Sequence, residues 1–408
     1  ERELSAFEIS VIANIDAPDP SAEYEAFLRN QYDPYRAQLE ILAKERKKWG
    51  DARQKIPEIM VMKEMPGLRE TYILERGHYA NRGKAVDRGT PEVLPAFPER
   101  EPANRLGLAK WLTSSDHPLM ARVTVNRYWQ MIFGRGLVST SEDFGMQGKP
   151  PTHPELLDWL ARDFVNSGWD LHHLIKKMVL SHTYGQESKI LPSTLEEDPE
   201  NLLLSRAPAH RLPAEMIRDG LLAHSGLLYK KIGGQSVKPY DLKVSFKPIN
   251  PDKAPNVYRR SVYTFWKRTA PNPVMMAMDA SKRDVCSVRR EQTESPSQSL
   301  IMLNGTQFVE SARATADSLV QKHGTQNPED LIEEAFRRLT SRKPTKLESE
   351  ILMQLLNEQK VHFNDSKQAE KFLKVGYYQA KSKELNYLAA VTNLVSTIMN
   401  FDGTISKR

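Results

Sequence analysis

The stretch that decides the fold runs from residue 126 to residue 184 and holds four dense motifs. They read N-R-Y-W-Q-M-I-F-G-R-G-L-V at 126–138, E-D-F-G at 142–145, T-H-P-E-L-L-D-W-L at 152–160 and S-H-T-Y at 181–184. Apolar residues recur there at helical spacing and are interrupted by Gly and Pro, which predicts short helices joined by tight loops. Functional side chains gather in such loops and at helix starts, so this stretch is also a place to look for a site.

Working outward, helical periodicity dominates the rest of the chain. Helices are predicted at 20–55, 104–113, 119–133, 155–166, 171–180, 212–228, 296–304, 306–322, 328–340, 345–361 and 383–400. Short strands are predicted at 59–62 and 71–74, on either side of a Pro66-Gly67 turn, and at 257–266. The expected fold class is therefore mainly α, a multi-helix bundle-like domain with one or two small β-hairpins or short strands.

Three segments of different character predict the domain organisation. Residues 1–56 read as an N-terminal helical arm, a remnant of an upstream domain or a linker to it, because the first residues resemble the middle of a helix. Residues 57–102 are rich in Gly, Pro and charge, and read as an extended strap with short strands. Residues 103–408 are expected to form one helical domain.

The composition excludes several classes of protein. No apolar run is long enough for a membrane span, and the single cysteine, Cys286, cannot form an internal disulfide. No C-x-x-C-H motif occurs, so no haem c or other cofactor is expected in this segment. Residues 204–300 hold seventeen Lys and Arg against eight Asp and Glu. That surplus suits an anionic ligand or an acidic partner, and equally a solvated face that pairs with acidic segments elsewhere.

Many ordered motifs together resemble one family. They are V-x-x-N-R-x-W at 123–129, F-G-R-G-L-V at 133–138, D-F-G at 143–145, H-P-E-L-L-D-W-L at 153–160, S-H-T-Y at 181–184, D-P-E-N at 198–201, R-L-P-A-E at 211–215 and R-R-S-V-Y at 259–263. The chain resembles, over about residues 60–405, the C-terminal domain of a planctomycete cytochrome-associated family of exported proteins of unknown function.

That resemblance implies a location and neighbours but no reaction. It implies export to the periplasm or the cell surface, and a helical fold for the domain. It also implies that a haem-c domain and another helical domain precede this segment. The partner expected from it is therefore an upstream domain or a cytochrome-type module of the same protein, and haem c would belong to that absent part.

Three residues of the 126–184 stretch are candidates for catalysis. His153 and Glu155 stand two apart at a helix start, and with Asp143 they could serve as acid and base. The structural alternative is that Thr152 and Glu155 form a capping box, which would already explain Glu155. A metal site is left open by these residues.

Candidate ligand-binding residues fall in two groups. Asn126, Arg127 and Arg135 flank a loop in which Gly134 and Gly136 permit close approach of a ligand, although Arg135 could instead pair with Asp143. The second group is basic except for one acid and consists of Arg211, Glu215, Arg218, Arg260, Arg289 and Arg290. Arg211, Glu215 and Arg218 share one helix face, so an anion site and a salt-bridge lattice are both open.

The function expected from these patterns is that of a helical domain of an exported multidomain, cytochrome-associated protein. It would bind an anionic ligand, such as an acidic or sulfated glycan, in an Arg-rich cleft. One alternative is a hydrolase or lyase that uses His153 with Glu155 or Asp143, so enzyme activity is left open. Another is a structural docking module for a haem-c domain or partner subunit. Nucleic acid is not expected as a partner, because no known nucleic-acid module is recognisable.

Overall fold

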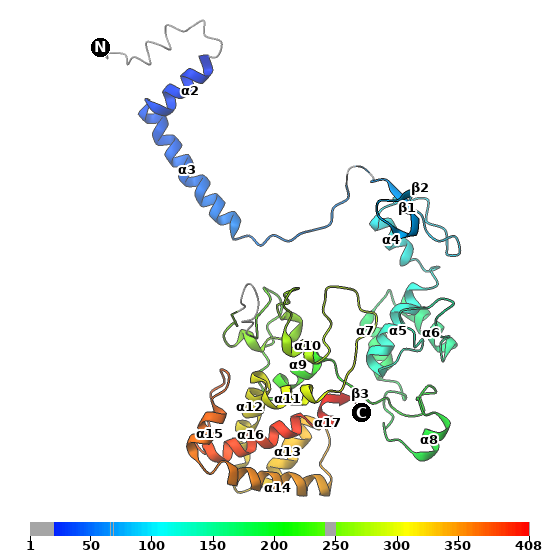
Figure 1. Ribbon diagram of the computed structural model, residues 1–408, viewed down its shortest axis with the longest axis vertical. Coiled ribbons are helices and arrows are strands. Elements are labelled where there is room, and N and C mark those ends of the chain that lie inside the picture. The colour runs from blue at the N-terminus through cyan, green and yellow to red at the C-terminus, as the bar shows by residue number, and fades with distance from the viewer. Residues whose placement is uncertain (1–19, 66, 68, 241–249, 408) are drawn as a thin grey trace. The chain divides into compact units, whose positions relative to one another are not determined.

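The computed structural model describes residues 20–65, 67, 69–240 and 250–407. The chain divides into two compact units, Glu1–Arg88 and Gly89–Arg408, which we call unit 1 and unit 2. Helices dominate the described residues, and the strands among them form two small antiparallel sheets of two strands each (Figure 1). The predicted mainly α fold is confirmed.

Unit 1 consists of two helices and a hairpin. Its elements are α2 (Pro20–Asn30), α3 (Asp33–Gln54), β1 (Thr71–Leu74), the 3-10 turn η1 (Glu75–Gly77) and β2 (Arg82–Val86). A proline in its first turn favours the start of α3, because the missing N–H would have no partner there. Among the described side chains from Tyr24 to Arg88, none is buried. Unit 1 therefore has no hydrophobic core of its own within the described residues.

The strand prediction for this region was partly wrong. Residues 71–74 do form a strand, but their partner is β2 at 82–86 and not residues 59–62, which have no regular structure. The 75–81 turn closes this hairpin through Arg76 and Gly77, both with positive φ. The 75–81 turn is short, so pairing β1 with β2 closes only a small loop and costs little chain entropy. Residues 59–62 are then left without a strand partner. Pro66 of the expected turn lies outside the described residues.

Unit 2 begins with a group of short helices. These are α4 (Arg105–Leu112), α5 (Met120–Phe133), α6 (Pro154–Asn166), α7 (Leu171–Val179) and α8 (Pro192–Glu197), of which α5, α6 and α7 build the first core. Asn104 caps α4 and Asp170 caps α7 by accepting from backbone N–H groups of the first turn. Apolar side chains of α5, α6 and α7 form one buried cluster that includes Val125, Phe133 and Phe164.

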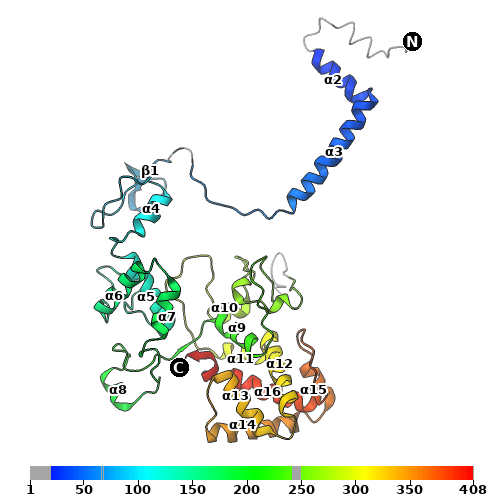
Figure 2. The same cartoon turned by 180° about the vertical axis from the view of Figure 1, so that it is seen from behind.

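A second core is built from the later helices. They are α9 (Ala214–His224), α10 (Pro273–Ala277), α11 (Pro296–Asn304), α12 (Thr306–His323), α13 (Pro328–Thr340), α14 (Lys346–His362), α15 (Ser366–Leu373), α16 (Leu385–Met399) and α17 (Asp402–Ile405). Helices α12 and α16 lie side by side in the centre of this group in both views (Figures 1 and 2). Thr345 and Glu348 form the predicted capping box of α14. Met275 and Met278 are buried in this core.

A small sheet joins the two cores of unit 2. Strand β3 (His210–Arg211) pairs with β4 (Ser406–Lys407), so residues far apart in the sequence meet. The Lys407 ammonium lies over the ring of Tyr184, 4.0 Å from its centroid, and also faces Phe133. Gly134 ends α5 with φ +77, and a Cβ there would approach Nδ1 of His210 to 2.9 Å. Only glycine therefore fits at the first Gly of the G-R-G loop without moving β3.

The strand predicted at 257–266 was wrong. The segment instead forms two 3-10 turns, η2 (Asn256–Tyr258) and η3 (Ser261–Tyr263). Several of its backbone N–H groups make turn bonds, as in Tyr263 N to Arg260 O at 2.9 Å, and among the described residues its pairing with other extended backbone is limited to two isolated bridges, Tyr229 with Arg259 and Val237 with Thr264. The carbonyls of Val257 and Arg259 accept from the buried Arg218 guanidinium, so these carbonyls are not available to a neighbouring strand.

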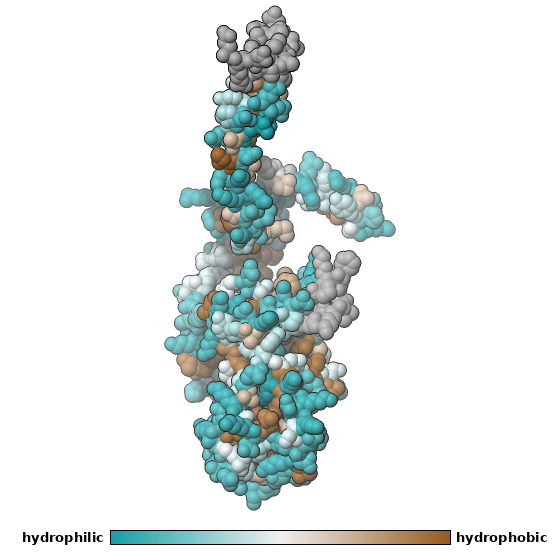
Figure 3. All heavy atoms as spheres, turned by 90° about the vertical axis from the view of Figure 1, so that its left-hand side faces the viewer, coloured by the Kyte–Doolittle hydropathy of each residue, from teal (hydrophilic) through white to brown (hydrophobic). Residues whose placement is uncertain are grey.

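The surface of the described residues is mixed in character. Hydrophilic side chains predominate on the face that Figure 3 shows, with apolar residues scattered among them. No described helix combines the length and the apolar composition that a bilayer crossing requires.

Candidate functional site

The second group of predicted ligand residues lies in β3 and α9. Arg211 is in strand β3 and not on the predicted helix face, because α9 begins only at Ala214, after Pro213, whereas Glu215 and Arg218 are in α9. A buried polar network here fastens a long loop. Asp279 accepts from the Arg211 guanidinium at 2.6 Å, from Thr293 N at 2.7 Å and from the Thr293 hydroxyl at 2.9 Å. Gln298 donates to the same carboxylate and accepts from Arg211. These contacts close residues 279–293 into a loop whose two ends meet, which we call the 279–293 loop.

The electrostatics of Asp279 match this fastening role. Burial by itself would raise the pKa of the Asp279 carboxyl, but the hydrogen bonds from Thr293 and Arg211 outweigh burial and hold the pKa below its usual range. Asp279 also has φ +62, a left-handed conformation that is unfavourable for a residue other than Gly. The network therefore holds a strained backbone position in place.

A second contact ties the 279–293 loop to α9. Arg290 donates to Glu215 at 2.6 Å, from a side chain that is 44% exposed. Such an exposed ion pair stabilises the fold only slightly, so it serves mainly to orient the loop. On the other side, Trp266 donates to the carbonyl of Lys282 at 2.6 Å and stacks under the Arg283 guanidinium.

Arg218, one turn further along α9, fastens a second loop, residues 256–264. Its buried guanidinium donates to the carbonyls of Val257 and Arg259, to Ser261 Oγ and to Gln307, and pairs with Asp219 at 3.2 Å. Burial lowers the pKa of Arg218 to about 10, and the charge of Asp219 counteracts that effect. Even so the guanidinium stays charged at neutral pH. Arg218 thus positions the 256–264 loop and is closed off from solvent.

Four cations on this part of the molecule are free of such bonds. Residues 259–290, which we call the basic segment, hold eight Lys and Arg against two Asp, a net charge of +6. Within the described residues, no hydrogen bond or ion pair is formed by four of these cationic side chains, all exposed, namely Arg260, Arg268, Lys282 and Arg289. The arginines of the second group therefore divide into those that hold loops, Arg211 and Arg218, and those that meet solvent, Arg260 and Arg289.

The first group of ligand residues has mostly internal partners. Asn126 is fully buried and binds the backbone of Val138 in both directions, with Oδ1 accepting at 2.8 Å and Nδ2 donating at 3.0 Å. It thereby shapes the G-R-G loop. Arg135 pairs with Glu200 at 2.9 Å, and not with Asp143. Arg127 is exposed and has no hydrogen-bond or ion-pair partner among the described residues.

The three candidate catalytic residues are not joined to one another. His153 Nδ1 lies 3.0 Å from Thr152 Oγ1, and Asp143 accepts from the N–H of Gly145 at 2.7 Å. Glu155 is exposed. No hydrogen bond or ion pair links His153 to Glu155 or Asp143 among the residues that the structure describes. His153 and Asp143 thus each have a neighbouring group of their own as hydrogen-bond partner.

The predicted capping box at Thr152 and Glu155 was also wrong. The helix α6 begins at Pro154 with His153 as its N-cap, and no side chain caps it. The Thr152 hydroxyl and N–H both face the carbonyl of Leu137, at 3.4 Å and 2.9 Å. Thr152 is therefore engaged in holding the G-R-G loop, which the local pattern alone does not reveal.

Several residues that matter at α9 were not among the predicted ones. Gln298, Ser261 and Gln307 complete the two networks, yet they carry no spacing signal because the arginines that they bind are 43 to 89 residues away. Arg268 and Lys282 could have been found by counting charge over the basic segment. Across the described parts of the chain, no three His, Cys, Asp or Glu side chains are placed to hold a metal ion.

Comparison with known proteins agrees with the motifs. No curated protein matches the chain, and no solved structure matches it. The family model described as PSD1, protein of unknown function (DUF1553), matches residues 104–356. That range contains Asn126, Arg211 and Arg218, and also the whole basic segment. It spans more than half of the 408 residues. The chain therefore belongs to the PSD1 family of proteins of unknown function.

Proposed function

We propose that this domain binds an anionic ligand at the exposed cations of the basic segment. The observation that carries the proposal is the set of four exposed cationic side chains without an ion-pair partner among the described residues, Arg260, Arg268, Lys282 and Arg289. Unneutralised positive charge on one segment raises the local concentration of anions.

The fastening of the two loops supports this proposal. Arg211 and Asp279 hold the base of the 279–293 loop, and Arg218 holds the 256–264 loop. A backbone held in place before binding loses less conformational freedom when the ligand arrives. The buried arginines would thus contribute to affinity indirectly, while Arg260 and Arg289 contact the ligand.

This proposal differs from an Arg-rich cleft in the residues that supply the charge. Arg135, Arg211, Arg218 and Arg290 each face a carboxylate within 3.2 Å. Their charge is largely compensated, so they add little attraction for an anion. The proposed recognition surface is instead formed by exposed side chains of the basic segment, three of which, Arg260, Lys282 and Arg289, lie on the two fastened loops.

For the ligand we propose an acidic or sulfated glycan, in an exported protein that works beside a cytochrome module. The ligand class follows from the chemistry of guanidinium groups, which bind sulfate and carboxylate through two N–H donors. The exported and cytochrome-associated setting rests on the family resemblance of the motifs.

The test is a binding titration of the full chain with three probes: a heavily sulfated glycan, a polyuronate and a neutral glycan. We expect the two anionic glycans to bind and to raise Tm, and the neutral glycan to do neither. Affinity should fall as salt rises from low to physiological strength, because exposed charges are screened beyond about 8–10 Å there. Replacing all four free cations by Ala should weaken binding about tenfold or more.

A matched variant controls for net charge. Lys189, Arg337, Lys346 and Lys367 are also exposed, and changing all four to Ala removes the same charge from outside the basic segment. This control should keep the affinity of the unmodified chain within about twofold. Equal losses in both variants would show that binding is a nonspecific effect of net charge. Poly-glutamate binding in place of glycan binding would identify an acidic protein as the partner and reject the glycan.

A further inference from the structure

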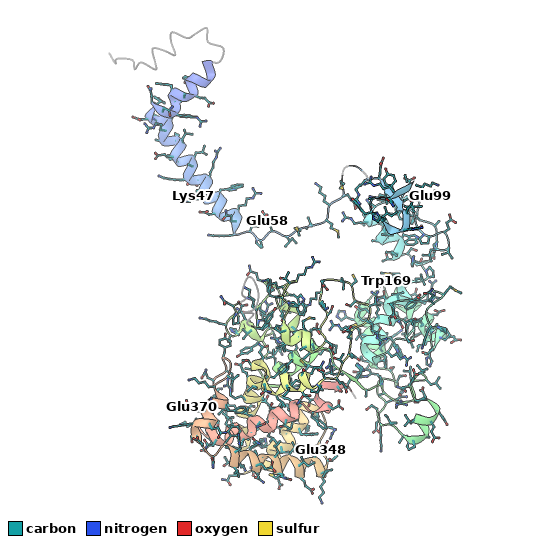
Figure 4. All side chains as sticks on the ribbon, in the orientation of Figure 1. Lys47, Glu58, Glu99, Trp169, Glu348 and Glu370 are labelled. Atoms are coloured by element: carbon teal, nitrogen blue, oxygen red, sulfur yellow. The ribbon has the colours of Figure 1, made fainter. Side chains whose placement is uncertain are left out.

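Helix α3 in unit 1 exposes an apolar stripe. None of its 22 residues is buried, and large apolar side chains stand open to solvent, with Leu42 exposed by 43% and Trp49 by 64%. Figure 4 shows α3 as a single rod with side chains projecting around it, Lys47 among them. A helix in water gains most of its stability from packing of an apolar face, so this face needs an occupant.

The spacing of the stripe is that of a coiled coil. Side chains alternate at intervals of three and four residues through Tyr32, Tyr35, Leu39, Leu42, Arg46, Trp49 and Arg53. Five of these seven positions are apolar or aromatic, over a length of three heptads. At 1.5 Å per residue, α3 extends about 33 Å, enough for three such repeats against a partner helix.

The two arginines on the stripe determine which pairing is compatible with a second copy. In a parallel pair, Arg46 would face Arg46 of the other copy inside the seam, with like charges in contact. In an antiparallel pair with Leu39 opposite Leu42, Arg46 instead faces Tyr35 of the other copy. A guanidinium over an aromatic ring is attractive, so the antiparallel arrangement turns a repulsion into a contact.

The charges along α3 favour the same direction. Residues 33–43 contain two acids and one base, whereas residues 44–54 contain five bases and two acids. A parallel pair would place the strongly basic halves together. An antiparallel pair brings each basic half against an acidic half, so both the core and the flanks are complementary only in that direction.

We propose that α3 is a self-association surface and that its occupant is α3 of a second copy of this chain, in antiparallel orientation. The Leu39 and Leu42 layers would form the centre of the interface. Tyr35 would pack on Arg46 of the other copy at either side, and Tyr32 on Trp49 at the ends. This interaction is independent of the anion-binding surface, because it involves unit 1 alone.

Directional cross-linking of the full chain tests the proposal. In a Cys286→Ser background, Tyr35→Cys and Arg46→Cys are made as separate chains, since Cys286 is the only cysteine. Mild oxidation of the mixture should give a disulfide-linked dimer of one chain of each kind, and neither chain alone should cross-link. Self-linking of Tyr35→Cys would show a parallel pair and overturn the proposal, as would no linkage in any sample.

Mass measurement across a dilution series supplies the second readout. The unmodified chain should pass from dimer to monomer on dilution, and Leu39→Glu with Leu42→Glu should weaken dimerisation about a hundredfold. Ile41→Glu is the control, because Ile41 is 52% exposed but lies off the stripe, and it should leave the dimer intact. Far-UV circular dichroism shows whether each variant keeps its helices. A chain that is monomeric at every concentration would contradict the proposal.

Discussion

Helices α3 and α16 are both long, yet they stand at opposite ends of the range of burial in this molecule. In α16, eleven of fifteen residues are buried, including the Leu388–Thr392 run, whereas α3 buries none. The difference lies in how apolar residues are distributed. Those of α16 surround the helix, so it can exist only inside a core, while those of α3 form a narrow stripe with charge on the remaining faces. Helix α16 is therefore covered by its neighbours in unit 2, whereas no described element of unit 1 buries a side chain of α3.

The largest expected effect tests whether the buried hydrogen bonds of Arg218 stabilise unit 2 as much as its apolar core does. Arg218→Ala should lower the free energy of unfolding by about 3–5 kcal/mol, because it leaves buried carbonyls and Asp219 without their donor. Urea denaturation measures the change. Arg337→Ala, which removes an exposed guanidinium from α13, is the control and should change stability by less than about 0.5 kcal/mol. Equal effects of the two variants would show that Arg218 is not an anchor.

A somewhat smaller effect contrasts the two helices directly. Leu388→Ala in α16 should cost about 3 kcal/mol, since the side chain is fully buried and its loss leaves a cavity. Ile41→Ala in α3 should cost less than about 0.5 kcal/mol, because that side chain is already half in water. Thermal unfolding followed by circular dichroism distinguishes the two. If Ile41→Ala is as costly as Leu388→Ala, α3 is not the open helix described here.

The smallest effect concerns acid stability in unit 2. Hydrogen bonds from Lys322, His323 and Arg338 lower the pKa of Glu334 to about 2, from an ordinary value of 4.5. The stability that this carboxylate contributes is present above pH 4.5 and is lost as pH falls toward 2, because the unfolded chain binds the proton first. Glu334→Gln should remove this part of the pH dependence in urea denaturation, whereas Glu350→Gln, at an exposed position, should not. Identical profiles for the two variants would contradict the assignment.

The sequence predicted those parts of the fold that depend on near neighbours. The Asp170 cap and the Thr345–Glu348 capping box are correct because each pairs a side chain with backbone three residues away or less. The cap at Thr152 failed because a carbonyl fifteen residues upstream, that of Leu137, takes the same hydroxyl. The strand at 257–266 failed for a similar reason, since Arg218 binds its carbonyls from 39 and 41 residues away.

In the candidate site, too, contacts between residues distant in the sequence could not be predicted. Arg211, Glu215 and Arg290 were predicted to line one ligand site. In the structure Arg211 pairs with Asp279 and Arg290 pairs with Glu215, so all three contact the 279–293 loop. Their roles could not be assigned from the sequence, because whether an arginine holds a loop or faces solvent depends on carboxylates up to 75 residues away. The role of Asn126 could not be assigned from the sequence either, since its side chain is buried, binds the backbone of Val138 and is not accessible to a ligand.

The fastening of two loops to β3 and α9 also bears on how this domain can change in evolution. Because Arg211 of β3 and Glu215 and Arg218 of α9 hold the loop bases, we expect substitutions at outward positions such as Arg260 or Arg289 to leave the backbone where it is. Substitutions at those exposed positions should then change the stability of the fold only slightly. One scaffold of this kind could serve a succession of ligands with only its outermost residues exchanged.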